Sequence, residues 1–212
     1  MMKRKKHLIW GGILLLGFMG FTLLVRTVDV QLIGLEESAV GLAALNGWVH
    51  DAIGIHLWWY GLTDWLGVLF VAVGLGFAAV GAVQLFKRRN LWKVDREILW
   101  LGVLYIAMAV CYIGFKRFPV NYRPVILNGE AESSYPSSHI LLTMCVMSTT
   151  VLQMKRLLPG ERIRRWITAV CTALLTVTIV GRVISGVHWA TDILGGILLA
   201  LALVELYRGV TE

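Results

Sequence analysis

Charged side chains are scarce in this sequence. Asp, Glu, Lys and Arg make up 16% of the 212 residues, whereas 58% of the residues are hydrophobic. A soluble domain of this length could not bury so much apolar surface. The composition therefore excludes an ordinary soluble protein and indicates a chain that lies partly in the hydrocarbon of a bilayer. The length fits one membrane domain, which we expect to cover residues 1–212.

Cysteine and proline are also rare. Three cysteines, Cys111, Cys145 and Cys171, each lie inside an apolar run, which argues for buried thiols and against disulfides or a zinc site. Prolines occur only between the apolar runs, so no long run is interrupted by a helix-breaking residue. They are Pro119, Pro124, Pro136 and Pro159.

Acidic residues are outnumbered, and the net charge of +7 could indicate binding to nucleic acid. The basic residues, however, sit in short clusters between long apolar runs, a pattern typical of membrane proteins. We therefore expect a bilayer and a lipid as partners, and no nucleic acid. The sequence gives no indication of the oligomeric state.

Six apolar runs are long enough to cross a membrane, at about 18–22 residues each. The first resembles the start of a signal peptide, but it is longer than a typical signal core and no small-residue cleavage site follows it. The sequence thus predicts an all-α, polytopic membrane protein with six transmembrane helices. These lie near residues 8–25, 65–86, 97–115, 138–154, 164–182 and 190–207.

The distribution of basic residues predicts the orientation. With six spans, the termini and the second and fourth loops share one side of the membrane, and that side carries 15 of the 20 Lys and Arg residues. Positive charge concentrates on the cytoplasmic side. We therefore expect a multi-pass protein of the cell membrane with both termini in the cytoplasm.

The first outer loop, about 26–64, is rich in tryptophan, and we expect one or two amphipathic helices lying in the membrane interface. A metal site built from His50, Asp51 and His56 is conceivable. Their spacing matches no helical ligand pair, so we expect no metal there.

Three stretches whose side chains could take part in a reaction lie at the outer ends of the spans. The first runs from Lys116 to Pro124 and contains Arg123. A lysine and an arginine together offer a point charge and a planar fork that suit a phosphate. Taken alone, both side chains could equally rest on lipid headgroups.

The second stretch is Tyr135-Pro-Ser137-Ser138-His139, at the start of the fourth span. Free backbone N–H groups at a helix N-terminus favour an anion beside Ser137, Ser138 and His139. His139 could donate a proton to a leaving oxygen. A capping serine followed by an interfacial histidine is the alternative.

The third stretch, Gly181 to Asp192, joins the last two spans. If the last span begins near His188, Asp192 lies one turn further on the same face. Its carboxylate can then fix the imidazole tautomer that leaves the other nitrogen free to attack. Arg182 can stabilise a transferring phosphoryl group, although an Arg–Asp pair at the boundary could be structural only.

Together, the three stretches are stronger evidence than any one of them. They place three cations, two histidines and an orienting carboxylate on the same side of the bundle, which is what metal-free phosphoryl transfer needs. No carboxylate cluster suited to magnesium accompanies them, and we interpret Glu130 and Glu132 as solvated loop residues. The sequence therefore predicts no cofactor.

This set resembles the signature of the type 2 phosphatidic acid phosphatase superfamily. Lys116 through Pro124 match its first motif, Pro136 through His139 the second, and Gly181 through Asp192 the third. The resemblance covers about 97–207. It implies that His188 is the nucleophile, Asp192 its orienting group and His139 the general acid. It also implies that the phosphate is held by Lys116, Arg123, Ser137, Ser138 and Arg182.

Two positions depart from the family pattern. Ser138 stands where the family has glycine, which limits backbone freedom near the phosphate. Gly181 stands where the family has serine and lacks a hydroxyl. Losing one neutral hydrogen bond costs about 1 kcal/mol, so we expect a slower but active enzyme. On this basis, Gly181→Ser should leave activity unchanged or raise it.

The leading hypothesis is a membrane phosphatase that removes phosphate from a lipid phosphate or diphosphate through a phosphohistidine, at a site on the extracytoplasmic side. By family analogy, a polyprenyl diphosphate such as undecaprenyl diphosphate is the first choice of substrate. Phosphatidylglycerol phosphate and phosphatidic acid come next. The alternatives are a lipid phosphotransferase with the same site and a catalytically weak lipid-binding or transport protein.

Activity should survive removal of divalent metal ions, because the candidate groups supply positive charge without a metal. Phosphate release from a lipid phosphate should be unchanged in EDTA. Vanadate, which mimics the trigonal phosphoryl transition state, should inhibit it. Loss of activity in EDTA that magnesium restores would contradict this mechanism.

Overall fold

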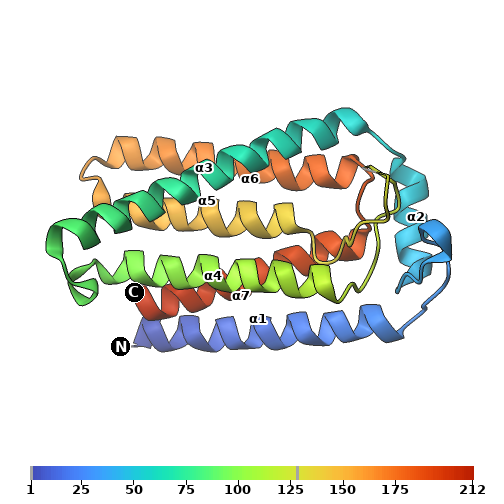
Figure 1. Cartoon of the computed structure of the whole chain (residues 1–212), viewed down its shortest axis with the longest axis horizontal. Coiled ribbons are helices and arrows are strands. Elements are labelled where there is room, and N and C mark those ends of the chain that lie inside the picture. Colours follow the sequence, from blue (N-terminus) through green and yellow to red (C-terminus); the bar gives the residue numbers. More distant parts are fainter. Residues whose placement is uncertain (1, 128) are drawn as a thin grey trace.

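The computed structural model describes residues 2–127 and 129–212. These residues form a bundle of six long helices that run roughly parallel or antiparallel to one another (Figure 1). Within the described residues there are two isolated β-bridges and no strand, so the predicted all-α class is confirmed. The long helices are α1 (Met2–Thr27), α3 (Leu57–Arg88), α4 (Arg96–Arg117), α5 (Ser138–Leu157), α6 (Glu161–Ile184) and α7 (Ala190–Thr211).

Five of the long helices, α1, α3, α4, α6 and α7, are apolar enough to cross a membrane by length and composition. The exception among the six predicted spans is α5, which carries Thr143, Thr149 and Gln153 as buried polar residues. It contacts α3, α4, α6 and α7. A helix that is packed against other helices does not need apolar side chains on all of its faces, and this accounts for the lower hydropathy of α5.

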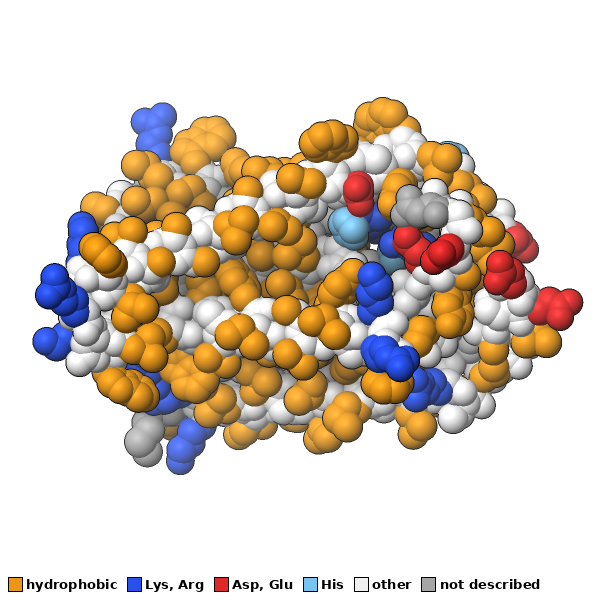
Figure 2. Space-filling view, in the orientation of Figure 1, with side chains coloured by type: hydrophobic (Ala, Val, Ile, Leu, Met, Phe, Trp, Pro, Cys, Tyr) orange, Lys and Arg blue, Asp and Glu red, His pale blue; other side chains and the backbone are white. Residues whose placement is uncertain are grey.

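The surface of the outer helices is covered with exposed apolar side chains, as expected of a bundle that faces lipid. Figure 2 shows hydrophobic side chains along most of the visible length, with basic residues at one end and both basic and acidic residues toward the other. The exposed residues of α1 and α4 include Ile13, Leu16, Met19, Leu23, Val103, Ile106, Val110 and Ile113.

Helix α3 begins earlier than the sequence predicted. It starts at Leu57, whereas we expected a span from residue 65. The expected span began at residue 65, directly after the polar residues Thr63 and Asp64. Nothing between Leu57 and Leu66 breaks a helix, so two further helical turns precede the expected start. The expected interfacial loop is correspondingly shorter and contains the short helix α2 (Ala43–Ile53).

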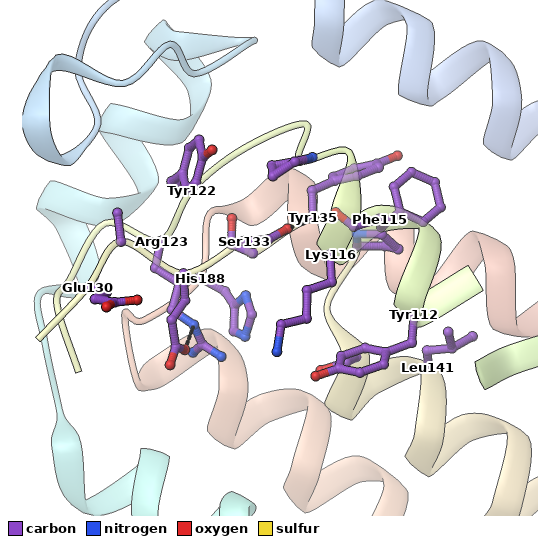
Figure 3. A pocket seen from close by; sticks show the side chains of 16 residues that line it. Tyr112, Phe115, Lys116, Tyr122, Arg123, Glu130, Ser133, Tyr135, Leu141 and His188 are labelled. Carbon is purple, nitrogen blue, oxygen red and sulfur yellow. Dashed lines mark hydrogen bonds and ion pairs between the residues drawn. The ribbon is translucent and has the colours of Figure 1, made fainter. Parts of the chain in front are cut away.

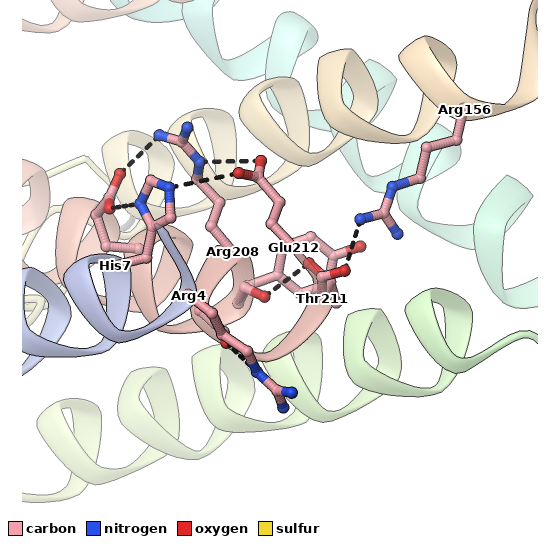
Figure 4. Close-up of polar contacts among 9 residues, drawn as sticks. Arg4, His7, Arg156, Arg208, Thr211 and Glu212 are labelled. Carbon is pink, nitrogen blue, oxygen red and sulfur yellow. Dashed lines mark hydrogen bonds and ion pairs between the residues drawn. The ribbon is translucent and has the colours of Figure 1, made fainter. Parts of the chain in front are cut away.

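Both termini lie at the same end of the bundle (Figure 1). Polar contacts tie the chain ends together there (Figure 4). Arg4 Nε donates to the carbonyl of Gly209 at 2.9 Å, and His7 Nδ1 lies 2.6 Å from Glu205 Oε2. Arg156 of α5 donates to the carbonyl of Thr211 at 2.8 Å. Helix α1 is therefore fastened along α7.

The end opposite the termini is closed by the loop between α1 and α3 and the loop between α4 and α5. Helix α2 lies across this end (Figure 1). Asn46 of α2 is fully buried, and its Oδ1 accepts the backbone N–H of Thr191 at 3.2 Å. The first outer loop therefore fixes the start of α7 in addition to any contact with the membrane interface.

This architecture puts Glu130 at the end of the bundle away from the termini, where its side chain is exposed. A single cysteine at position 130, in a variant whose native cysteines are replaced, should react with a membrane-impermeant thiol reagent on intact cells. A cysteine in place of Lys5 should react only after lysis, because we expect that end in the cytoplasm. The reverse labelling pattern would invert the predicted orientation.

Candidate active site

The three stretches that the sequence singled out converge at the end of the bundle opposite the termini. They line a cavity of about 420 Å³. Figure 3 shows Lys116, Arg123 and His188 around it, with Lys116 reaching from the end of α4 toward the other two. Lys116 is exposed, whereas Arg123 and His188 are buried. The side chains that line the cavity thus differ in solvent exposure, from the exposed Lys116 to the buried His188.

Arg123 is positioned by the loop between α4 and α5. Its backbone N–H donates to the carbonyl of Glu132 at 2.9 Å, and the N–H of Ser134 donates to the carbonyl of Asn121 at 2.9 Å. Its Nε also lies 3.0 Å from Glu132 Oε2. The interpretation of Glu132 as a solvated loop residue was therefore wrong, while Glu130 is exposed as expected.

The second stretch opens α5 as the sequence predicted. Ser137 occupies the N-cap position, but its side chain makes no capping hydrogen bond. Its backbone N–H donates instead to the carbonyl of Asp192 at 2.9 Å, which joins the start of α5 to the start of α7. Ser138 lines the cavity, and His139 follows in the first turn. The capping alternative for Ser137 is contradicted.

The third stretch ends α6 and begins α7. Between the two helices, Gly186 adopts φ +66°, a left-handed conformation that favours glycine. His188 follows this turn, and its Nδ1 lies 3.5 Å from Asp192 Oδ2. The carboxylate also accepts the backbone N–H of Trp189 at 3.0 Å and Asn121 Nδ2 at 3.2 Å. His188 and Asp192 therefore face each other as predicted, and two hydrogen bonds hold the carboxylate in place.

The environment of His188 favours the neutral imidazole. Its pKa is lowered well below the usual value, first by burial and then by the positive charges of Arg123 and Arg182. A neutral ring at neutral pH has a free lone pair on one nitrogen, which nucleophilic attack requires. With Nδ1 toward Asp192, the nitrogen left for chemistry is Nε2.

Several buried polar atoms at the end of the bundle that holds the three stretches have no hydrogen-bond partner within the described part of the chain. They come from all three stretches, and most can donate a hydrogen bond. They are Arg123 Nη1, Ser137 Oγ, His139 Nδ1, Arg182 Nε and Nη1, and both ring nitrogens of His188. Buried polar groups are rarely left unpaired, because each costs about 1–3 kcal/mol. A bound anion such as phosphate would satisfy them together.

Sequence reasoning missed three residues near this site. Asn121 lies inside the first stretch and supports Asp192. Asp64 of α3 lies 3.4 Å from Arg182, through Oδ1 and Nη2. Tyr60 places its ring 5.0 Å from the guanidinium carbon of Arg182. A charged residue within an apolar run was the available signal for Asp64, but its assignment to a loop hid it.

Comparison with known proteins agrees with this geometry. Residues 114–210 match the family model described as the PAP2 superfamily. Over these residues the chain is similar to the PAP2 superfamily. The resemblance expected over about 97–207 is thereby confirmed, and all three stretches lie within the PAP2 match.

The wider chain is similar to proteins of known function. It is 25% identical over 201 residues to phosphatidylglycerophosphatase B of Bacillus subtilis (strain 168), covering 92% of this chain and 93% of that protein. Its fold matches the crystal structure of a transmembrane PAP2 type phosphatidylglycerolphosphate phosphatase from Bacillus subtilis. That match has a TM-score of 0.61 at 20% identity and covers 94% of each chain. These matches support a PAP2-type membrane phosphatase.

The structure revises the expectation for Gly181. A Cβ at this position would lie 2.7 Å from Thr63 Cγ2 and 3.1 Å from Trp59 Cε3. Helix α3 therefore occupies the space that a serine side chain would need. Gly181 permits the close approach of α3 to α6, and the missing hydroxyl has a packing reason.

Gly181→Ser should now reduce stability and activity, because overpacking a tight contact costs about 1–3 kcal/mol. Thermal unfolding in detergent and phosphate release would measure both effects. Thr63→Ser removes the clashing methyl group and keeps the hydroxyl, which bonds the carbonyls of Trp59 and Tyr60. The double variant should recover part of the loss. A Gly181→Ser variant with native melting and higher activity would contradict this packing explanation.

Proposed function

We propose that this protein is a phosphatase that hydrolyses a lipid phosphate at the extracytoplasmic face of the membrane. The observation that carries the proposal is the set of buried, unpaired polar atoms around His188, which matches what a phosphate group requires. The PAP2 match and the similarity to phosphatidylglycerophosphatase B support the same activity.

In the proposed mechanism, His188 Nε2 attacks the phosphorus of the bound phosphate. A phosphorus–nitrogen bond forms while the bond between phosphorus and the lipid oxygen breaks. Asp192 stabilises the positive charge that develops on the His188 ring. His139 gives its proton to the departing lipid oxygen. Its Nδ1 is buried and has no partner among the described residues, so it is available to the leaving oxygen.

The cations act on the charge of the phosphoryl group. Arg182 is fully buried, and Arg123 is 8% exposed. Fixed positive charges in such a water-poor site stabilise a transferring phosphoryl group more strongly than they would in water. Lys116 adds an exposed charge at the open side, and the first turn of α5, from Ser138 on, offers backbone N–H groups. In the second step, water attacks the phosphohistidine and releases inorganic phosphate.

The surroundings of the site suit a lipid substrate. A polar hollow containing a histidine and basic side chains is flanked by hydrophobic surface on the bundle (Figure 2). The cavity lining joins the charged groups to Tyr112, Phe115 and Leu141. A lipid could therefore place its headgroup in the cavity while its chains remain in the bilayer.

Phosphatidylglycerol phosphate is the substrate that we favour. The named relative and the solved structure with this fold both act on that lipid by their descriptions. Polyprenyl diphosphate, the first choice from the sequence, becomes the second. Its larger diphosphate headgroup would have to share the same 420 Å³ cavity.

Purified protein in detergent should release phosphate from phosphatidylglycerol phosphate faster than from phosphatidic acid or undecaprenyl diphosphate. It should act poorly on water-soluble glycerol phosphate, which lacks chains to anchor it. Brief exposure to phosphate-labelled substrate should leave an acid-labile label on the protein.

His188→Asn should abolish both turnover and label, because it removes the attacking nitrogen. Lys5→Gln, a change at the opposite end, serves as the control and should behave as the native protein. Label that persists in His188→Asn would contradict the nucleophile assignment. Product that carries the phosphate on an added alcohol in place of water would favour a phosphotransferase.

A further inference from the structure

Asp64 brings a carboxylate to the active site from outside the three stretches. It belongs to the second turn of α3, well before the region that matches the PAP2 model, residues 114–210. Its Oδ1 lies 3.0 Å from His139 Nε2 and 3.4 Å from Arg182 Nη2. One carboxylate oxygen thus contacts both the expected proton donor and the most deeply buried cation.

The outer part of α3 is shaped to hold this contact. Gly67, one turn beyond Asp64, is so close to His139 that an added Cβ would lie 3.0 Å from Cδ2 and 3.1 Å from Nε2 of the ring. The backbone of α3 therefore lies directly against the imidazole. On the other side of Asp64, the ring of Tyr60 lies under the Arg182 guanidinium. Residues 60–67 form a platform that fixes both side chains.

The contact decides which nitrogen of His139 serves the substrate. Because Nε2 faces Asp64, Nδ1 is the nitrogen that remains, and it is buried without a partner in the described residues. We infer that Asp64 is a positioning residue for proton donation, which accepts the Nε2–H of His139 and thereby aims Nδ1–H at the leaving oxygen. This inference rests on the proposed function.

The charges around His139 explain why such a partner is needed. Arg182 of α6, Arg123 of the loop before α5 and His188 of the turn before α7 face it, and each can carry positive charge. Asp64 of α3 is the negative group that acts on it among the charged groups described there. A carboxylate beside the ring offsets part of this repulsion and so favours the protonated form of His139.

When the proton leaves through Nδ1, the ring becomes neutral and keeps its hydrogen on Nε2, where Asp64 still accepts it. The same tautomer is ready to be protonated again at Nδ1 by the water that attacks the phosphohistidine. Asp64 does not itself gain or lose a proton in this scheme. Its side chain is 50% exposed, so its charge is also partly screened by solvent.

The test compares two substrates that differ in how much they need an acid. A lipid phosphate has a basic alkoxide leaving group that must be protonated, whereas p-nitrophenyl phosphate has a leaving group that departs without help. Asp64→Asn should lower kcat for phosphatidylglycerol phosphate by about 10- to 100-fold, part of the usual contribution of a general acid. The loss for p-nitrophenyl phosphate should be severalfold smaller.

The same variant should separate kcat from KM. Removing a carboxylate beside Arg182 leaves more of its positive charge for the substrate, so KM and the inhibition constant for inorganic phosphate should stay the same or fall. In a His139→Ala background, Asp64→Asn should cause no further loss, because its partner is absent. A purely structural role would instead raise KM and reduce both substrates equally.

Two other variants complete the test. Asp51→Asn removes an exposed carboxylate of α2 at the same end of the bundle and should leave the kinetics unchanged. Gly67→Ala would displace the His139 ring by a few tenths of an ångström and keep the Asp64 charge, so it should reproduce the leaving-group dependence of Asp64→Asn. Gly67→Ala also provides the measurement if Asp64→Asn does not fold.

The outcomes separate this inference from the proposed function. Native protein that releases no phosphate from any substrate would overturn the proposed function and the role of Asp64 with it. Active native protein, together with Asp64→Asn at native rates or with equal losses on both substrates, would overturn the role of Asp64 alone.

Discussion

Asp192 is the residue on which the arrangement of the site depends. Its backbone carbonyl accepts the N–H of Ser137, and its carboxylate accepts Asn121 Nδ2 and faces His188. These contacts come from each of the three motif stretches. A fully buried carboxylate is costly unless it is paired and hydrogen-bonded. The carboxylate and the backbone carbonyl of this one residue therefore join the three stretches.

The same principle, applied to positive charge, supports the proposed binding of an anion. Arg182 and His188 are enclosed, and several of their nitrogens have no partner within the described residues. In a membrane bundle these groups cannot turn toward bulk water. Helix packing holds them in place. Burying these unpaired groups lowers the stability of the fold, and their partner is the proposed substrate. Unpaired buried polar atoms are normally only destabilising, but in this site they are the groups that we propose bind the phosphate.

Helix α3 contributes to the site without carrying any of the family motifs. It approaches α6 at Gly181 and α5 at Gly67, two positions where a side chain would collide. Close approach at glycine is a common way for membrane helices to pack, because lipid provides no hydrophobic drive between them. This packing also puts Asp64 beside His139 and Arg182. The departure from the family pattern at Gly181 and the extra carboxylate thus have one structural origin.

The sequence alone determined the helical class, most helix positions, the three motifs and the family resemblance, because hydrophobic periodicity and motif spacing are local properties of the chain. The starts of α5 and α7 agreed with the prediction, whereas α3 began eight residues before the expected start, because nothing between Leu57 and Leu66 breaks the helix. Only the tertiary structure decided which groups meet. Glu132 pairs with Arg123, Asp64 with His139, and a serine at Gly181 would meet Thr63. These contacts join residues far apart in the chain, and no local pattern encodes the distance between two helices.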